Sequence, residues 1–165
     1  MRRVLTAVGL VAILAALGGA ACLYAGIYDV GATAPHWQAT RWVLEQARLR
    51  SIRVHAAGLM PPADFGDPAR IAAGSAHFSE HCALCHSAPG VDAQDLAEGM
   101  APKPPDLSEV SKRYSPGELF WIVRNGIRMT GMPAWADHGD DDLWSIVAFL
   151  EKLAAPSPPP KEGPG

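Results

Sequence analysis

Cys82-Ala83-Leu84-Cys85-His86 carries the most specific chemical signal in this 165-residue chain. Two thiols three positions apart can each add to a vinyl group on one edge of a porphyrin, which gives two thioether bonds. The histidine that follows can then offer an imidazole nitrogen to the iron. A C-x-x-C-H run is the attachment signature for c-type haem. The motif therefore predicts one covalent haem c, held by Cys82 and Cys85, with His86 as an axial iron ligand.

A second motif, Gly131-Met132-Pro133, follows far enough along the chain to offer a thioether sulfur to the opposite haem face. Met/His ligation of haem iron raises its reduction potential. The glycine before Met132 gives conformational freedom, and the proline after it fixes a dihedral and favours an extended backbone. These neighbours favour Met132 over Met129 as the second axial ligand. Met100 is a weaker alternative.

Two other readings of the cysteine pair were weighed. A C-x-x-C sequence can be a redox dithiol or one half of a zinc site. A zinc site would need a second Cys or His pair at a plausible spacing, and none follows. A thioredoxin-like motif would need a surrounding βαβ pattern, which the sequence lacks. Haem attachment remains the favoured interpretation.

From Asp67 to Leu153 the chain resembles class I cytochromes c. The resemblance implies an all-α fold, a small helical bundle around one covalent haem, and electron transfer without substrate turnover, so that the protein is not an enzyme. Its motifs cover a little over half of the chain. The matching pieces are Gly74-x-x-x-Phe78-x-x-x-Cys82-x-x-Cys85-His86, Gly131-Met132-Pro133-Ala134-Trp135, and a last helix with Trp144 and Phe149.

The same resemblance implies two packing details. The first haem-domain helix crosses the last helix at a small residue, and Gly74, followed by Phe78, matches that position. A backbone carbonyl in the loop after the motif accepts a hydrogen bond from the His86 ring, with Pro102 and Pro104 as candidates. Such an outer partner fixes the ring and tunes the metal.

Charge is distributed unevenly along the chain. Residues 1–63 carry six Arg against two acidic residues, net +4, whereas residues 64–154 carry seven Lys or Arg against fourteen Asp or Glu, net −7. An acidic redox domain is a poor nucleic-acid binder. It fits a redox partner that has a basic patch or that docks through apolar contacts.

Val4 to Tyr28 is an uncharged stretch of 25 residues. As a helix it would span about 37 Å, enough to cross a hydrocarbon core of about 30 Å. A cleaved signal peptide is the rival reading, but its apolar region normally runs only about 7–15 residues. A lipoprotein reading would acylate Cys22, but Gly19 stands where leucine is usual. An uncleaved membrane anchor is favoured.

Local signals then divide the chain into four parts. The expected parts are a transmembrane anchor at 1–30, a juxtamembrane helix and Pro-containing linker at 31–66, a haem domain at 67–154 and a disordered Pro-rich tail at 155–165. The juxtamembrane helix, near 36–57, could lie on the membrane surface or pack on protein. Haem-domain helices are expected at 68–81, capped by Asp67, from the capping box at Ser115 to about 125, and from about 140.

The expected function is that of a membrane-anchored monohaem carrier of single electrons. Four Arg after the apolar stretch leave its orientation unsettled by charge counting. The resemblance places the haem domain on the periplasmic side of a bacterial inner membrane. A dehydrogenase or quinol-oxidising complex would be the donor, and an oxidase or another cytochrome the acceptor. The alternatives are a fixed electron-transfer subunit of a larger membrane oxidoreductase complex, or a haem enzyme or gas sensor with a displaceable methionine.

Overall fold

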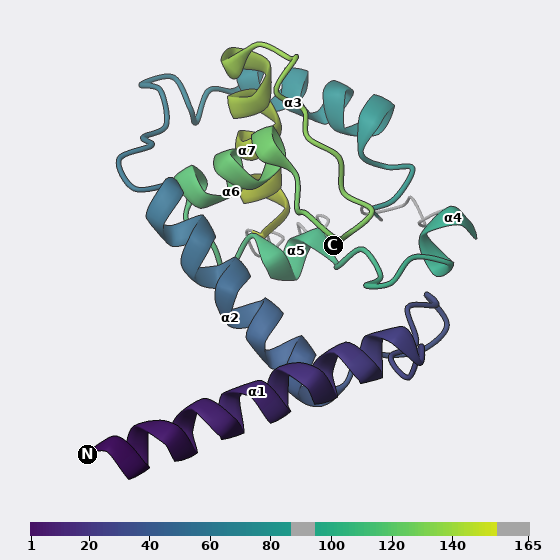
Figure 1. Cartoon of the computed structure of the whole chain (residues 1–165). Helices are drawn as coiled ribbons and strands as arrows, with labels where there is room; N and C mark the ends of the chain where they lie inside the picture. Colours follow the sequence, from purple (N-terminus) through teal and green to yellow (C-terminus); the bar gives the residue numbers. More distant parts are fainter. Residues whose placement is uncertain (87–94, 155–165) are drawn as a thin grey trace, which may run out of the picture. The chain divides into compact units, whose positions relative to one another are not determined.

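The computed structural model describes residues 1–86 and 95–154, and its regular elements within these ranges are all helices (Figure 1). The all-α prediction is therefore confirmed. The expected Pro-rich tail at 155–165 lies outside the described residues. The helices are α1 (Arg2–Tyr24), α2 (Gln38–His55), α3 (Pro68–His81), α4 (Asp95–Glu98), α5 (Leu107–Val110), α6 (Pro116–Asn125) and α7 (Asp140–Ala154).

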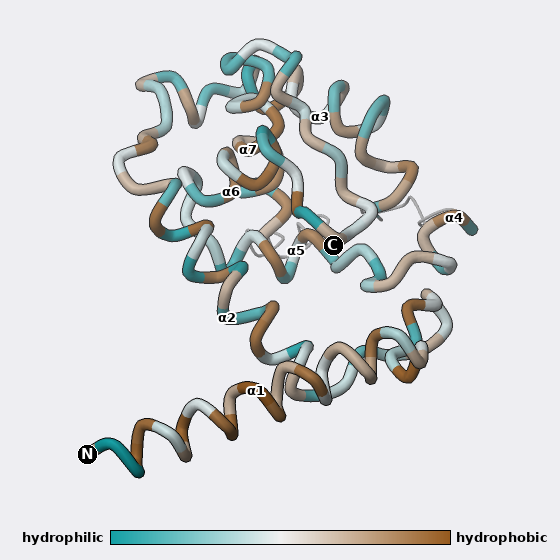
Figure 2. Tube along the Cα trace, in the orientation of Figure 1, coloured by the Kyte–Doolittle hydropathy of each residue, from teal (hydrophilic) through white to brown (hydrophobic). Residues whose placement is uncertain are grey.

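The chain forms two compact units, one from Met1 to Pro35 and one that begins at His36. The first unit contains α1, which is apolar along most of its length and has no buried residue (Figure 2). Its mean hydropathy reaches 2.3 over an 18-residue window. Within the described ranges, α1 alone is long and apolar enough to cross a membrane. A signal sequence near the N-terminus would have the same length and composition.

The second unit is built on the crossing of α3 and α7. A Cβ atom added at Gly74 would lie 1.8 Å from the carbonyl oxygen of Ser145, so only glycine allows this approach. Phe78, one turn further along α3, is 1% exposed, and its ring centroid lies 5.3 Å from that of Phe149. The expected close crossing at Gly74 is confirmed.

α6 closes the core from the other side of α7. The Ser115 side chain accepts a hydrogen bond from the Glu118 N–H, and the Glu118 carboxylate accepts one from the Ser115 N–H, which is the expected capping box. The helix ends at Gly126, whose φ of 64° lies in the left-handed region that favours glycine. Phe120 stacks on Trp144 at a centroid distance of 4.2 Å. This stack joins α6 to α7.

The segment before α3 packs on the domain and does not hang free as a linker. Ile52 at the end of α2 is 1% exposed, and the His55 ring lies 5.6 Å from that of Trp121 on α6. A Cβ atom at Gly117 would lie 2.4 Å from the Leu59 carbonyl oxygen. Phe65 meets Trp144 edge-on. These contacts place the end of α2 and the segment after it against the core, within the compact unit that begins at His36.

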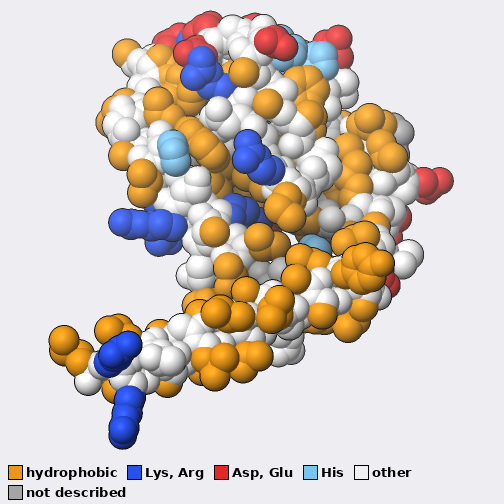
Figure 3. Space-filling model, in the orientation of Figure 1, with side chains coloured by type: hydrophobic (Ala, Val, Ile, Leu, Met, Phe, Trp, Pro, Cys, Tyr) orange, Lys and Arg blue, Asp and Glu red, His pale blue; other side chains and the backbone are white. Residues whose placement is uncertain are grey.

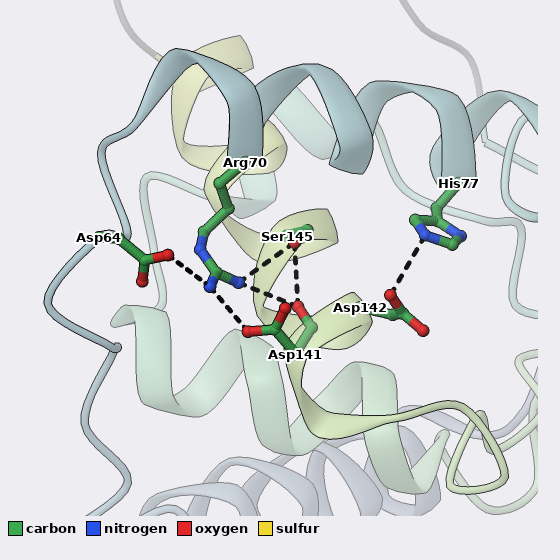
Figure 4. A network of polar contacts seen from close by, with 6 residues as sticks. All are labelled: Asp64, Arg70, His77, Asp141, Asp142 and Ser145. Atoms are coloured by element: carbon green, nitrogen blue, oxygen red, sulfur yellow. Dashed lines mark hydrogen bonds and ion pairs between the residues drawn. The ribbon is translucent and has the colours of Figure 1, made fainter.

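Arg70 ties this segment to both crossing helices (Figure 4). Its guanidinium donates to Asp64 Oδ2 at 2.8 Å, to Asp141 Oδ1 at 2.7 Å, and to Ser145 Oγ at 3.2 Å. Asp67 occupies the N-cap position of α3, as expected, but its side chain makes no capping hydrogen bond. The N-terminal end of α3 is therefore secured mainly through Arg70.

Candidate functional site

The cysteine motif lies in a tight turn at the C-terminal end of α3. The Cys82 N–H donates to the Phe78 carbonyl at 2.8 Å and so completes the last helical turn. The N–H groups of Cys85 and His86 then both donate to the Cys82 carbonyl, at 3.0 and 2.9 Å. Both cysteines are free thiols and half-buried, whereas Leu84 between them is 45% exposed. The turn thus holds the two thiols and the histidine together.

The thiol chemistry argues against a redox dithiol. Burial, and secondarily the neighbouring Cys85, raise the pKa of Cys82 to about 11. Redox-active and metal-binding thiols instead have lowered pKa values, because the thiolate is the reactive form. The part of the chain that the structure describes also contains no group of three or more His, Cys, Asp or Glu residues placed to hold a metal ion. Neither alternative reading of the C-x-x-C pair gains support.

The His86 ring is held by a backbone carbonyl, but not by one of the two expected. Its Nδ1 lies 3.2 Å from the Pro105 oxygen, so Nδ1–H donates and Nε2 is the nitrogen that can bind a metal; within residues 1–86 and 95–154 Nε2 has no hydrogen-bond partner. The expectation of Pro102 or Pro104 was therefore wrong, since the fold brings the next proline to the ring. Burial lowers the pKa of His86, which keeps the imidazole in the neutral form that binds metals.

The Met132 loop has its own hydrogen bonds. The Met132 N–H donates to Thr130 Oγ1 at 3.2 Å, and the Ile127 N–H donates to the Met132 carbonyl at 3.3 Å. Met132 is half-buried against the apolar core. Met129 has a φ of 62° and is 71% exposed. The loop therefore supports the side chain of Met132 and directs that of Met129 to solvent.

Met100 lies close to this loop. A Cβ atom at Gly131 would come within 2.8 Å of the Met100 sulfur, so glycine makes room for that side chain. Gly131 has a second role, besides conformational freedom, that the sequence pattern did not reveal. Met100 is thus half-buried beside the predicted ligand loop.

The other histidines near the motif have partners of their own. His77 Nε2 lies 3.4 Å from Asp142 (Figure 4). The His81 ring lies 5.3 Å from Trp135 and 5.2 Å from His138. No local sequence pattern connects Trp135 and His138 with α3, because these residues lie far from that helix along the chain. These contacts are consistent with histidines that pack at the surface.

The donor set suits a covalently attached haem. Two neighbouring thiols can form thioethers, and His86 offers a free Nε2 whose ring is already oriented. The half-buried thioether of Met132 is a soft donor of the kind found opposite histidine. Leu119 and Val123 on α6 add buried apolar side chains to the core of the same domain.

Comparison with known proteins agrees with a domain that carries a covalently attached haem. Residues 69–150 match the family described as "Cytochrome C oxidase, cbb3-type, subunit III". No curated protein and no solved structure gives a significant match. The chain contains a c-type cytochrome domain, consistent with a class I monohaem cytochrome c. Such a domain binds haem c covalently and serves electron transfer, so the resemblance seen in the sequence is confirmed.

Proposed function

We propose that this protein is a membrane-anchored monohaem cytochrome c that carries single electrons between redox proteins on the periplasmic side of a bacterial inner membrane. Cys82 and Cys85 hold the haem through thioethers, and His86 and Met132 are the axial ligands of its iron. The observation that carries the proposal is the His86 ring, which is oriented by Pro105 beside the thiol pair with Nε2 free.

When bound, the haem supplies a one-electron iron couple. The polypeptide contributes position and environment. The hydrogen bond to the Pro105 carbonyl fixes the tautomer of His86 and makes its imidazole a more basic metal ligand. His86 and Met132 would together hold the haem iron and keep a substrate from it, and this arrangement would favour electron transfer over catalysis. Cys82, Cys85, His86 and Met132 are partly buried, and the burial of a haem site affects its reduction potential through the local dielectric.

The proposed membrane anchor and the proposed partners are supported by two different parts of the chain. α1 has the length and composition of a membrane span, and the residues from 64 to 154 carry the net charge of −7. A donor such as a dehydrogenase or quinol-oxidising complex, and an acceptor such as an oxidase or another cytochrome, would meet this acidic domain through basic or apolar surfaces.

A test of carbon monoxide binding distinguishes an electron carrier from a haem enzyme or gas sensor. The full chain should contain one haem per polypeptide and be reduced and reoxidised reversibly. Its ferrous form should not bind carbon monoxide at neutral pH, because both axial positions are filled. Rapid carbon monoxide binding would contradict the carrier and favour the enzyme or sensor.

A fixed subunit of a larger membrane oxidoreductase complex is the second candidate. The description of the matched family, an oxidase subunit, favours it. Purification from native membranes in a mild detergent distinguishes the two. A carrier should separate from its partners in moderate salt, whereas a subunit should co-purify with them in constant stoichiometry.

A further inference from the structure

A cavity of about 270 Å³ lies between α2 and the segment that joins α5 to α6. Both walls belong to the unit that begins at His36. The cavity is not part of the cysteine and methionine site, since none of the predicted haem ligands lines it. Its lining residues are Glu45, Arg48, Leu49, Arg53, Arg113, Tyr114 and Glu118.

Three arginines converge on this cavity from two elements. Arg48 and Arg53 lie on one side of α2, and Arg113 follows α5. The α2 wall is held in place because Ile52, adjacent to Arg53, is buried against the rest of the unit. Tyr114, next to Arg113, is half-buried and packs on the core. Packing therefore holds both walls of the cavity in place, whereas Arg48, Arg53 and Arg113 are themselves exposed.

These three charges are not neutralised within the described part of the chain. The arginine ion pairs there belong to Arg70 and Arg124. Glu118 lines the cavity but its Oε2 already accepts the Ser115 N–H at 2.8 Å in the capping box. Glu45 is the other acidic lining residue and forms no ion pair with them. Figure 3 shows Lys and Arg side chains at several separate places on this face, beside α2 and elsewhere, whereas Asp and Glu lie mostly at the top and right edges.

We propose that this cavity binds a phosphate group, presented either by an anionic lipid headgroup or by a soluble phosphate compound. Guanidinium groups present planar pairs of N–H donors that match phosphate oxygens, and Arg is preferred where such bidentate recognition occurs. A bound dianion or monoanion removes the mutual repulsion of Arg48, Arg53 and Arg113. Tyr114 and Leu49 also line the cavity.

Titration calorimetry with inorganic phosphate tests the proposal on the full chain in a non-ionic detergent after removal of bound lipid. Wild-type protein should bind one phosphate per chain. Arg48→Gln and Arg113→Gln should each weaken binding at least tenfold. Arg50→Gln is the matched control, because Arg50 is exposed on α2 but does not line the cavity, and it should change affinity less than twofold.

Glu45→Gln gives an independent check that does not depend on losing an arginine. Removal of its negative charge from the cavity should strengthen phosphate binding several-fold. Circular dichroism should show that every variant remains folded. Absence of phosphate binding, or equal weakening by Arg50→Gln and Arg48→Gln, would overturn the proposal.

Nanodiscs then distinguish the two sources of the phosphate. The same titration is repeated in discs of phosphatidylcholine alone and in discs that also contain phosphatidylglycerol, at about 0.15 M salt so that surface charge is screened over about 8 Å. If a lipid headgroup is the natural occupant, phosphate binding should weaken at least tenfold in the anionic discs. If a soluble phosphate compound is the occupant, affinity should be the same in both.

Discussion

At the residue scale, Met132 and Met129 lie three positions apart in one loop but in different surroundings. Met132 is half-buried with both of its backbone polar groups hydrogen-bonded, whereas the side chain of Met129 is 71% exposed. A thioether must be directed inward and held there to remain on iron through each redox cycle. The difference in burial therefore favours the same residue as the glycine and proline that flank Met132.

Substitution by alanine tests this choice. Met132→Ala should abolish the long-wavelength iron–sulfur charge-transfer band of the oxidised protein, lower the reduction potential and allow carbon monoxide to bind the ferrous form. Met129→Ala should keep the band, because an exposed side chain has no role on the iron. Absorption spectra of both variants measure the band. Its loss in Met129→Ala alone would show that Met129, and not Met132, binds the iron.

At Gly74 an added methyl group would clash with the backbone of α7. Its Cβ would lie 1.8 Å from the Ser145 carbonyl oxygen, which is backbone and cannot rotate away. Gly74→Ala should lower the free energy of unfolding by about 3 kcal/mol, at the upper end of the usual cost of overpacking. Guanidinium denaturation measures it. Gly66→Ala is the control, since nothing lies within 4 Å of that Cβ position. Equal stability of the two variants would contradict the close crossing.

At the element scale, Arg70 links the segment before α3 to the start of α7. Its side chain is 9% exposed, and it donates to Asp64, to Asp141 and to Ser145. Arg70 therefore positions the beginning of α3, the helix that leads into the cysteine motif.

Arg70→Met should destabilise the protein by about 1–3 kcal/mol, in keeping with hydrogen bonds to charged groups. Arg124→Met is the control, because the Arg124–Asp140 pair is 3.3 Å long and its arginine side chain is 46% exposed. Arg124→Met should lower the free energy of unfolding by less than about 1 kcal/mol. Thermal unfolding at neutral pH measures both, and an equal effect of the two substitutions would speak against a special role for Arg70.

The same contact predicts a pH dependence. Hydrogen bonding to Arg70 lowers the pKa of Asp64, so the folded state favours the charged carboxylate. A group with a lowered pKa stabilises the fold above its ordinary pKa and loses that contribution as the pH falls through the lowered value. The stability difference between wild type and Arg70→Met should therefore be constant near neutral pH and shrink below about pH 4.

At the scale of the whole molecule, the haem domain includes residues that precede its sequence motifs. Ile52 and Ala56 on α2 are buried, and the Leu59 backbone lies against Gly117 at the start of α6. α2 is thus part of the domain at its C-terminal end. Its exposed surface carries two of the three arginines that line the cavity, Arg48 and Arg53.

Two fragments test this boundary when they are expressed with haem-attachment machinery in the periplasm. A fragment that begins at His36 should unfold at a higher temperature than one that begins at Asp64. The shorter fragment loses the burial of Ile52 and the contacts of Leu59, worth about 1.5–3 kcal/mol for each large apolar side chain. Thermal unfolding followed by haem absorbance compares them. Equal midpoints would show that α2 and the following segment add nothing to the domain.

Several features could be predicted from the sequence because they depend on near neighbours along the chain. The C-x-x-C-H motif at Cys82 carries its own chemistry within five residues. Pro68 and His81 bound α3 as expected, and the capping box at Ser115 opens α6 as expected, since caps are formed within one helical turn. The close crossing at Gly74 followed from family resemblance, not from local pattern.

Other features depend on segments far apart in the sequence, which only folding brings together. Pro105, rather than Pro102 or Pro104, lies within hydrogen-bond distance of the His86 ring, 19 positions away along the chain. The segment from 58 to 66 reads as a linker by composition, yet Leu59 and Phe65 pack on the core. The three arginines around the cavity are separated by up to 65 positions, from 48 to 113. Each of these contacts gains its energy from burial or from charges that meet in space, and short-range propensities contain no information about either.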